Sequence, residues 1–313
     1  MKILFCGSGW KTAAERVRKR VSPFEFRMQD MARPLIEQIA DVNVIIPTME
    51  KITGEIIRSA TELKLIQQFG VGLEGVDLKT AEECNVYVAN AAGTNSVTVA
   101  ESTLLLMLAL SRRFKESQSA FNKGIWGHPI GCELMGKNLG IIGFGNTGRE
   151  LAKRAYCMGM KIYAIKRTSE PDLIRKYNLE FLGTPQDLKI LLRESDFLSI
   201  HTPLTNETQH LISEVELKQM KRTAFLINVS RGPVIDKAAL LKALQKKWIA
   251  AVGLDVYWEE PANPNDPLFQ FENVVTLPHI AGSSNESQDR IEEVVVSNIF
   301  RIARGEKPIH LRT

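Results

Sequence analysis

Three stretches in the second half of the chain carry polar residues directly after short apolar runs. "LINVSRGPVID" contains Arg231, "GLDVYWEEPANPNDPL" contains Asp255 and Glu260, and "TLPHIAG" contains His279. Ligands of open parallel sheets bind outside the carboxyl ends of strands, so we expect these residues at one edge. Arginine can bind a carboxylate through two N–H groups, histidine can exchange a proton near neutral pH, and a carboxylate favours the imidazolium. Such a set could reduce a 2-oxo acid.

A glycine-rich turn precedes these stretches. "LGIIGFGNTGRE" places Gly143, Gly145 and Gly148 in a GxGxxG pattern between an apolar run and a helical pattern, and "KIYAI" follows as a second strand. The first glycine permits a tight turn, the second a close approach to a pyrophosphate, and the third close helix–strand packing. The helix N-terminus offers free N–H groups to phosphates. We therefore expect a dinucleotide site that includes Phe144, Asn146 and Thr147.

Each polar residue has a plainer explanation when taken alone. A lone arginine after a strand is usually structural, a glutamate before proline is usually solvated, and a lone histidine is usually a satisfied core group. Their occurrence together, on the sheet edge that carries the glycine turn, favours catalysis. The earlier "CGSGW", with Gly7 and Gly9, has Thr12 in place of a third glycine, so we interpret it as a turn only.

Composition is that of a soluble globular protein without unusual charge. The 313 residues are 44% hydrophobic and 24% charged, with 40 basic and 36 acidic residues and a net charge of +4. This balance predicts no nucleic-acid binding. The apolar runs are too short for a signal peptide or a membrane span, and the four cysteines form no CxxC pair. We expect a cytoplasmic protein with reduced thiols, no metal site and no membrane association.

Short apolar runs alternate with amphipathic stretches from end to end, which predicts parallel sheets covered by helices. The length fits two doubly wound α/β domains better than one. The loops "NAAGTNS" and "AGSSNES" are the candidate crossings between them. We predict a substrate domain of residues 1–96 and 285–313, and a dinucleotide-binding domain of residues 97–284, with a cleft between the lobes. The expected strands are "KILFC", "NVIIP", "LKLIQQF", "VYVAN", "NLGIIGF", "KIYAI", "DFLSI", "TAFLINV", "AVGLDV" and "NVVTL".

Over nearly its full length, the chain resembles the D-isomer-specific 2-hydroxyacid dehydrogenase family. The resemblance is carried by the order and spacing of "FGVGLEGVDL", "VAEST…MLAL", "GKNLGIIGFGNTGRELAKRA", "HTPLTNETQHLI", "LINVSRGPVID", "LDVYWEEP" and "LPHIAG". It implies a Rossmann cofactor domain inserted into a flavodoxin-like substrate domain. It also implies a catalytic Arg231, Glu260 and His279, with Glu260 preferred over Glu259 because it directly precedes the proline.

The same resemblance implies further binding residues. Backbone N–H groups near Val71 and Gly72 would bind the substrate carboxylate together with Arg231. His279 would donate a proton to the substrate oxygen while a nicotinamide hydride adds to C2. The residues expected near the cofactor, beyond the glycine turn, are His201, Pro203, Thr208, Val229, Asp255 and Gly282.

The stretch "YAIKRTSE" bears on the choice of cofactor. NAD enzymes carry an acidic residue here that accepts hydrogen bonds from the adenosine ribose and would repel the 2′-phosphate of NADP. Counted along the family pattern, that position is Lys166, followed by Arg167 and Thr168. Two cations and a hydroxyl suit a phosphate, although a solvated basic turn would have the same composition. We predict a preference for NADP(H), with NAD(H) possible.

The resemblance leaves several functions open. A reductase of glyoxylate or hydroxypyruvate is the leading prediction. Pro47 in "IPTMEKIT" replaces an arginine that binds phosphate in phosphoglycerate-oxidising relatives, which disfavours an NAD-dependent phosphoglycerate dehydrogenase. The family pattern would also suit a nucleotide-sensing, corepressor-like binding protein or a formate- or phosphite-oxidising enzyme. The apolar helix with "VAESTLLLMLALSRRF" is consistent with the homodimer that the family implies, and a helix packed within one chain would look the same.

Overall fold

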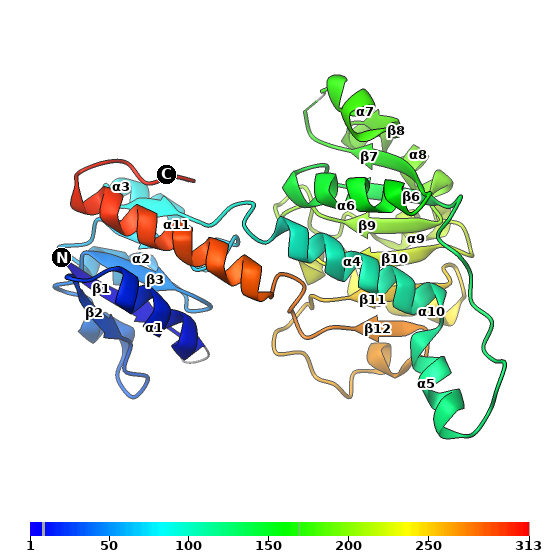
Figure 1. The fold of residues 1–313 in the computed structure, drawn as a ribbon, viewed down its shortest axis with the longest axis horizontal. Helices are drawn as coiled ribbons and strands as arrows, with labels where there is room; N and C mark the ends of the chain where they lie inside the picture. The colour runs from blue at the N-terminus through cyan, green and yellow to red at the C-terminus, as the bar shows by residue number, and fades with distance from the viewer. Residues whose placement is uncertain (8–9, 169, 313) are drawn as a thin grey trace. The chain divides into compact units, whose positions relative to one another are not determined.

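The chain divides into two compact units (Figure 1). The computed structural model describes residues 1–7, 10–168 and 170–312. The first unit comprises Met1–Asn95 and Ser284–Thr313, and the second comprises Ser96–Ser283. Each crossing falls one residue earlier than the sequence predicts.

The first unit contains a five-stranded sheet in the order β2-β1-β3-β4-β5, with all neighbours parallel. This order is that of flavodoxin-like folds. Its strands are β1 (Lys2–Cys6), β2 (Glu25–Met28), β3 (Val44–Pro47), β4 (Leu65–Gln67) and β5 (Tyr87–Ala89).

Helices cover both faces of this sheet because side chains alternate between the faces along each strand. Ile3 and Phe5 of β1 join one core with α1 (Lys11–Arg20) and α11 (Asn285–Ala303). Leu4 and Cys6 join the opposite core. The elements on that side are η2 (Leu35–Gln38), α2 (Gly54–Ser59) and α3 (Leu78–Glu83).

The second unit contains a seven-stranded parallel sheet in the order β12-β11-β10-β9-β6-β7-β8. The chain builds outward from β6 to β8 and then returns to place β9 on the other side of β6. This reversal is the switch point at which doubly wound sheets bind ligands. The strands are β6 (Asn138–Ile142), β7 (Lys161–Ile165), β8 (Leu179–Gly183), β9 (Phe197–Ile200), β10 (Phe225–Asn228), β11 (Ala251–Leu254) and β12 (Val274–Thr276).

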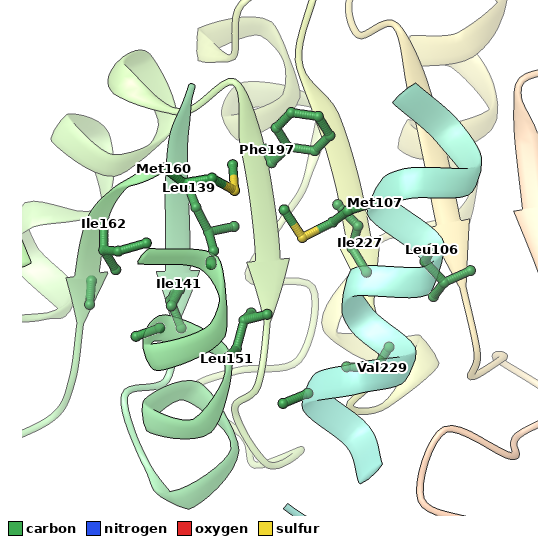
Figure 2. Close-up of a cluster of buried hydrophobic side chains, with 14 of the residues drawn as sticks. Leu106, Met107, Leu139, Ile141, Leu151, Met160, Ile162, Phe197, Ile227 and Val229 are labelled. Atoms are coloured by element: carbon green, nitrogen blue, oxygen red, sulfur yellow. The ribbon is translucent and has the colours of Figure 1, made fainter. Parts of the chain in front are cut away.

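Two buried cores flank the second sheet. Leu139 and Ile141 of β6 face the core shared with α4 (Ser96–Ser111), α6 (Asn146–Cys157) and α7 (Asp172–Tyr177). Figure 2 shows Met107 of α4 and Leu151 of α6 in this core. Helices α8 (Leu188–Glu194), α9 (Glu214–Gln219) and α10 (Lys237–Gln245) cover the other face. The remaining elements are α5 (Phe114–Asn122), η3 (Pro185–Asp187), η4 (Gly232–Val234) and η5 (Pro267–Gln270).

The two parallel sheets confirm the predicted α/β class, and the ten expected apolar runs all contain strands. The sequence pattern did not predict β2 and β8, which lie at the edges of the two sheets. Both are partly exposed: no residue of "EFRM" is buried, and only the first and last residues of "LEFLG" are. Among the described helices, none is long and apolar enough to cross a membrane.

Candidate functional site

A hydrogen-bonded histidine and carboxylate lie at the carboxyl edge of the second sheet. Nδ1 of His279, which follows β12, is 2.6 Å from Oε2 of Glu260, which follows β11. Oε1 of Glu260 accepts the backbone N–H of Tyr257 at 3.0 Å, so both carboxylate oxygens are engaged. The ring of His279 keeps its Nε2 for another partner, since Nδ1 is the atom bound to Glu260. The neighbouring Glu259 is not the residue that pairs with His279.

Asp255 holds the backbone around this histidine. Its carboxylate oxygens accept the N–H groups of Ile280 and Ala281 at 2.8 and 2.9 Å. His279 itself has φ +54°, a left-handed conformation that costs energy for a residue with a side chain. The two bonds from Asp255 directly after His279 therefore stabilise a turn that the backbone alone would not favour.

The charges around His279 favour its protonated form. The hydrogen bond to Glu260 raises the pKa of His279 above its ordinary value, and the charges of Glu260 and Asp255 add to this. Desolvation and the positive charge of Arg231 oppose the rise without cancelling it. Although desolvation raises the pKa of Glu260, its bonds with His279 and Tyr257 outweigh that effect and lower it. The two shifts therefore favour the charged pair, imidazolium with carboxylate, over the neutral pair.

Arg231 lies just beyond β10, in a turn organised by a residue that the sequence analysis missed. The Asn228 side chain is fully buried, accepts the N–H and hydroxyl of Ser230, and donates to the carbonyl of Arg231 at 2.9 Å. A Cβ at Gly232 would lie 2.1 Å from the backbone of Tyr257, so only glycine lets this turn approach the segment that carries Glu260. A buried amide ending an apolar strand was the available signal, because buried polar groups need partners.

The predicted phosphate turn has the local geometry of a dinucleotide site. Gly143 has φ +95°, and a Cβ there would lie 2.7 Å from the backbone of His201 at the end of β9. A Cβ at Gly148 would lie 2.6 Å from the carbonyl oxygen of Gly143, so α6 starts close against the turn. Gly145 faces open space, with no described atom within 4 Å of such a Cβ. Asn146 and Thr147 begin α6, whereas Phe144 is buried in the core.

Lys166 immediately follows β7, and its ammonium group binds the carboxylate of Glu170. Arg149 of α6 also donates to Glu170, at 3.2 Å. Arg167 and Thr168 are exposed beside them. The sequence pattern indicated the cations but not Glu170, which places a carboxylate next to them near the end of β7.

The other predicted cofactor residues differ in charge, burial and hydrogen-bond partners. Desolvation lowers the pKa of His201 to about 3, so its ring is neutral, and Nε2 lies 2.8 Å from the hydroxyl of Ser199. The hydroxyl of Thr208 donates to the carbonyl of Pro203 at 2.6 Å and shapes the turn after β9. The side chain of Val229 belongs to the core, as Figure 2 shows, so only its backbone is available to a ligand. Gly282 follows Ala281 in the segment held by Asp255.

Val71 and Gly72 belong to the first unit, after β4. Asn90, which the sequence pattern did not indicate, directly follows β5 and donates to the carbonyl of Val71 at 2.7 Å. Arg312 in turn donates to Asn90 at 3.3 Å, so the C-terminal segment and this loop share one amide. Gly7 directly follows β1 and has φ +131°, whereas Gly9 lies outside the described residues, so the turn interpretation of "CGSGW" stays a prediction. The described part of the chain contains no cluster of three or more metal-ligating side chains.

Comparison with known proteins supports the family resemblance that the sequence motifs indicate. The family model described as D-isomer specific 2-hydroxyacid dehydrogenase, NAD binding domain, matches residues 104–281. Glyoxylate reductase from Thermococcus litoralis is 41% identical over 287 residues, covering 88% of this chain and 85% of the relative. Glyoxylate reductase from Korarchaeum cryptofilum is 39% identical over 284 residues, covering 88% of this chain and 84% of the relative.

Solved structures of similar proteins share the whole fold. NADPH-dependent glyoxylate/hydroxypyruvate reductase from Sinorhizobium meliloti, in complex with NADP and malonate, matches with a TM-score of 0.87 and 27% identity, covering 100% of this chain and 96% of the other. D-Lactate dehydrogenase from Aquifex aeolicus, complexed with NAD and lactic acid, matches with a TM-score of 0.85 and 28% identity, covering 97% and 96%. Sequence motifs, sheet order and these matches agree: the chain belongs to the D-isomer specific 2-hydroxyacid dehydrogenase family.

Proposed function

We propose that this protein is a reductase of small 2-oxo acids, of the glyoxylate or hydroxypyruvate type, that uses NADPH. The observation that carries the proposal is the 2.6 Å contact between His279 and Glu260, with Arg231 close enough to influence the pKa values of both. An acid paired with a carboxylate, next to an arginine that can bind a carboxylate, suits a 2-oxo acid. The similarity to glyoxylate reductases supports the same substrate class.

In the proposed mechanism, each residue of the site has a separate task. Arg231 binds the substrate carboxylate and thereby orients the carbonyl group. His279 holds a proton that it donates from Nε2 to the carbonyl oxygen as negative charge develops there. Glu260 keeps the imidazolium charged and fixes the orientation of the ring. In oxidation, neutral His279 accepts the proton instead. A contribution of Val71 and Gly72 to carboxylate binding stays a prediction.

The residues of the second unit fit a nicotinamide dinucleotide. The open space at Gly145 allows a pyrophosphate to approach the backbone, and the first turn of α6 supplies N–H groups and a positive dipole end. When bound, the cofactor supplies the hydride for C2. The turn between β6 and α6 would hold its pyrophosphate, and the segment after β7 its adenosine ribose.

The substrate class can be tested by screening 2-oxo acids spectrophotometrically with NADPH and NADH side by side. We expect glyoxylate or hydroxypyruvate with NADPH to give the highest kcat/KM. His279→Ala should lower kcat by about 10²- to 10⁴-fold, the usual contribution of a general acid, while cofactor binding is retained. Near wild-type turnover in that variant would show that His279 is not the proton donor.

The pH dependence tests the role of Glu260. Reduction requires protonated His279, so kcat/KM should fall as the pH rises through the pKa of His279, which Glu260 raises. Glu260→Gln removes that anion, so the descending limb should move to lower pH. Glu259→Gln removes the adjacent charge without touching the pair and serves as the matched control. A limb that stays in place in Glu260→Gln, or moves equally in both variants, would refute the assignment.

The preference for NADPH is supported by residues of this chain. Lys166 and Arg167 stand where an NAD enzyme would carry an acidic residue, and Thr168 adds a hydroxyl. The named ligands of the solved relatives do not decide the matter, because they include both NADP and NAD.

Replacing both cations should shift the preference toward NADH. In Lys166→Asp/Arg167→Ala, we expect the ratio of kcat/KM for NADPH to that for NADH to fall by at least roughly 10- to 100-fold, since even one hydrogen bond to a charged group contributes about 1.5–3 kcal/mol. The two ratios are obtained from initial rates at saturating 2-oxo acid. An unchanged ratio would show that Lys166 and Arg167 do not select the cofactor and belong to a solvated basic turn.

We also propose that the protein is a homodimer. An exposed apolar strip runs along α4 and α5 and into the segment after α5, and Trp126 in that segment is 81% exposed. Figure 1 shows α5 beyond the end of α4, and Lys115 of α5 donates to the carbonyl of Val274 on β12 at 3.0 Å. Exposed aromatic and aliphatic residues in one strip are typical of subunit interfaces. The strip comprises Leu105, Leu108, Phe114, Phe121, Ile125, Trp126 and Ile130.

Sedimentation of the purified protein tests the dimer. We expect the wild type to sediment as a dimer at micromolar concentration, and Leu105→Asp to sediment as a monomer because it buries a charge in the interface. Val215→Asp places the same charge on α9, at another exposed apolar residue outside the strip, and should remain dimeric. A monomeric wild type would contradict the proposal.

A further inference from the structure

An ion pair at the end of β7 partly buries Lys166, whereas the neighbouring Arg167 and Thr168 are exposed. The Lys166 side chain is only 15% exposed, and its ammonium group binds one carboxylate oxygen of Glu170. Its backbone N–H donates to the carbonyl of Gly183 on β8 at 3.0 Å, so both ends of the residue are fixed. Bonding to Lys166 lowers the pKa of Glu170, so the carboxylate stays ionised at neutral pH.

A second cation reaches the same carboxylate from α6. Nη2 of Arg149 lies 3.2 Å from the other oxygen of Glu170. The Arg149 guanidinium also lies 6.0 Å from the centre of the Tyr177 ring, within the range of a cation–π contact. Nη2 of Arg149 donates to Glu170, and the adjacent Nε, which is buried, has no partner among the described residues. Two adjacent N–H groups of a guanidinium are the arrangement that binds a phosphate bidentately.

This cluster adjoins the phosphate turn. The backbone N–H groups of Gly143 and Phe144 both donate to the carbonyl of Ile165, at 3.0 and 3.2 Å. The glycine turn is thereby attached to the last residue of β7, directly before Lys166. A dinucleotide whose pyrophosphate binds at this turn would present its adenosine ribose to the segment that begins with Lys166.

We propose that the carboxylate of Glu170 occupies the place of the 2′-phosphate of NADPH, and that it tunes cofactor selectivity by competing with that phosphate for Lys166 and Arg149. The inference rests on the proposed use of NADPH and adds two residues to it. Arg149 becomes a ligand of the 2′-phosphate, and Glu170 becomes an internal competitor.

The charges favour replacement of the Glu170 carboxylate by the 2′-phosphate at Lys166 and Arg149. A phosphate monoester carries about −1.5 to −2 at pH 7, more than the single charge of Glu170, and offers three acceptor oxygens to the two cations. Glu170 is 44% exposed, so its carboxylate can rotate into water when it is displaced. NADH has a neutral hydroxyl at the same position and would leave the ion pairs in place. Removing the Glu170 charge should therefore strengthen binding only for ligands that carry the 2′-phosphate.

Calorimetric titration with 2′,5′-ADP and 5′-AMP isolates this effect, because the two probes differ only in the 2′-phosphate. Glu170→Gln should tighten 2′,5′-ADP by roughly three- to tenfold, the order of one partly exposed ion pair, with 5′-AMP unchanged. Arg149→Gln should weaken 2′,5′-ADP and spare 5′-AMP. Asp172→Asn is the matched control, since it removes a nearby carboxylate that no described contact links to Lys166 or Arg149, and it should leave both affinities unchanged.

The outcomes separate this inference from the proposed cofactor preference. If the wild type binds 2′,5′-ADP no more tightly than 5′-AMP, the proposed preference for NADPH is wrong. In that case, tighter binding of 2′,5′-ADP by Glu170→Gln would still show that Glu170 competes with the 2′-phosphate. If the wild type prefers 2′,5′-ADP but Glu170→Gln leaves its affinity unchanged, Glu170 does not compete. Weaker 2′,5′-ADP binding in Glu170→Gln would show that the carboxylate positions Lys166, and would overturn the inference.

Discussion

Two carboxylates fix His279 from different sides, and the chemistry of the site depends on both. Glu260 binds Nδ1 of the ring, while Asp255 accepts the two backbone N–H groups that follow the histidine. The second contact matters because His279 has a left-handed backbone, which a residue with a side chain adopts only when its surroundings compensate. Asp255 and Glu260 both follow β11, so the end of one strand orients the histidine that follows the next.

The parallel sheet explains why residues distant in sequence meet at this edge. Strands β9, β10, β11 and β12 run in the same direction and are neighbours in that order, so the segments after them emerge together. The same edge carries the turn between β6 and α6, next to β9 across the switch point. The proposed cofactor turn and the His279–Glu260 pair therefore lie on the same edge of the sheet.

Most of this arrangement could be predicted from sequence because its signals are local. Buried parallel strands such as β6 and β10 appear as continuous apolar runs, and Arg231, Glu260 and His279 directly follow such runs or lie a few residues beyond them. Edge strands β2 and β8 lack that signal because they are partly exposed. The role of Glu170 could not be predicted, since only the folded chain shows that its carboxylate contacts both Lys166 and Arg149 of α6.

The central claim is that Glu260 keeps His279 protonated so that it can donate a proton. The most direct measurement is an NMR titration of the His279 ring in the wild-type protein without substrate, assigned by comparison with His279→Ala. The account predicts an inflection above the ordinary histidine pKa, with the ring carrying protons on both nitrogens below it. An inflection at or below that ordinary value would show that the carboxylate does not stabilise the imidazolium, and would contradict the account.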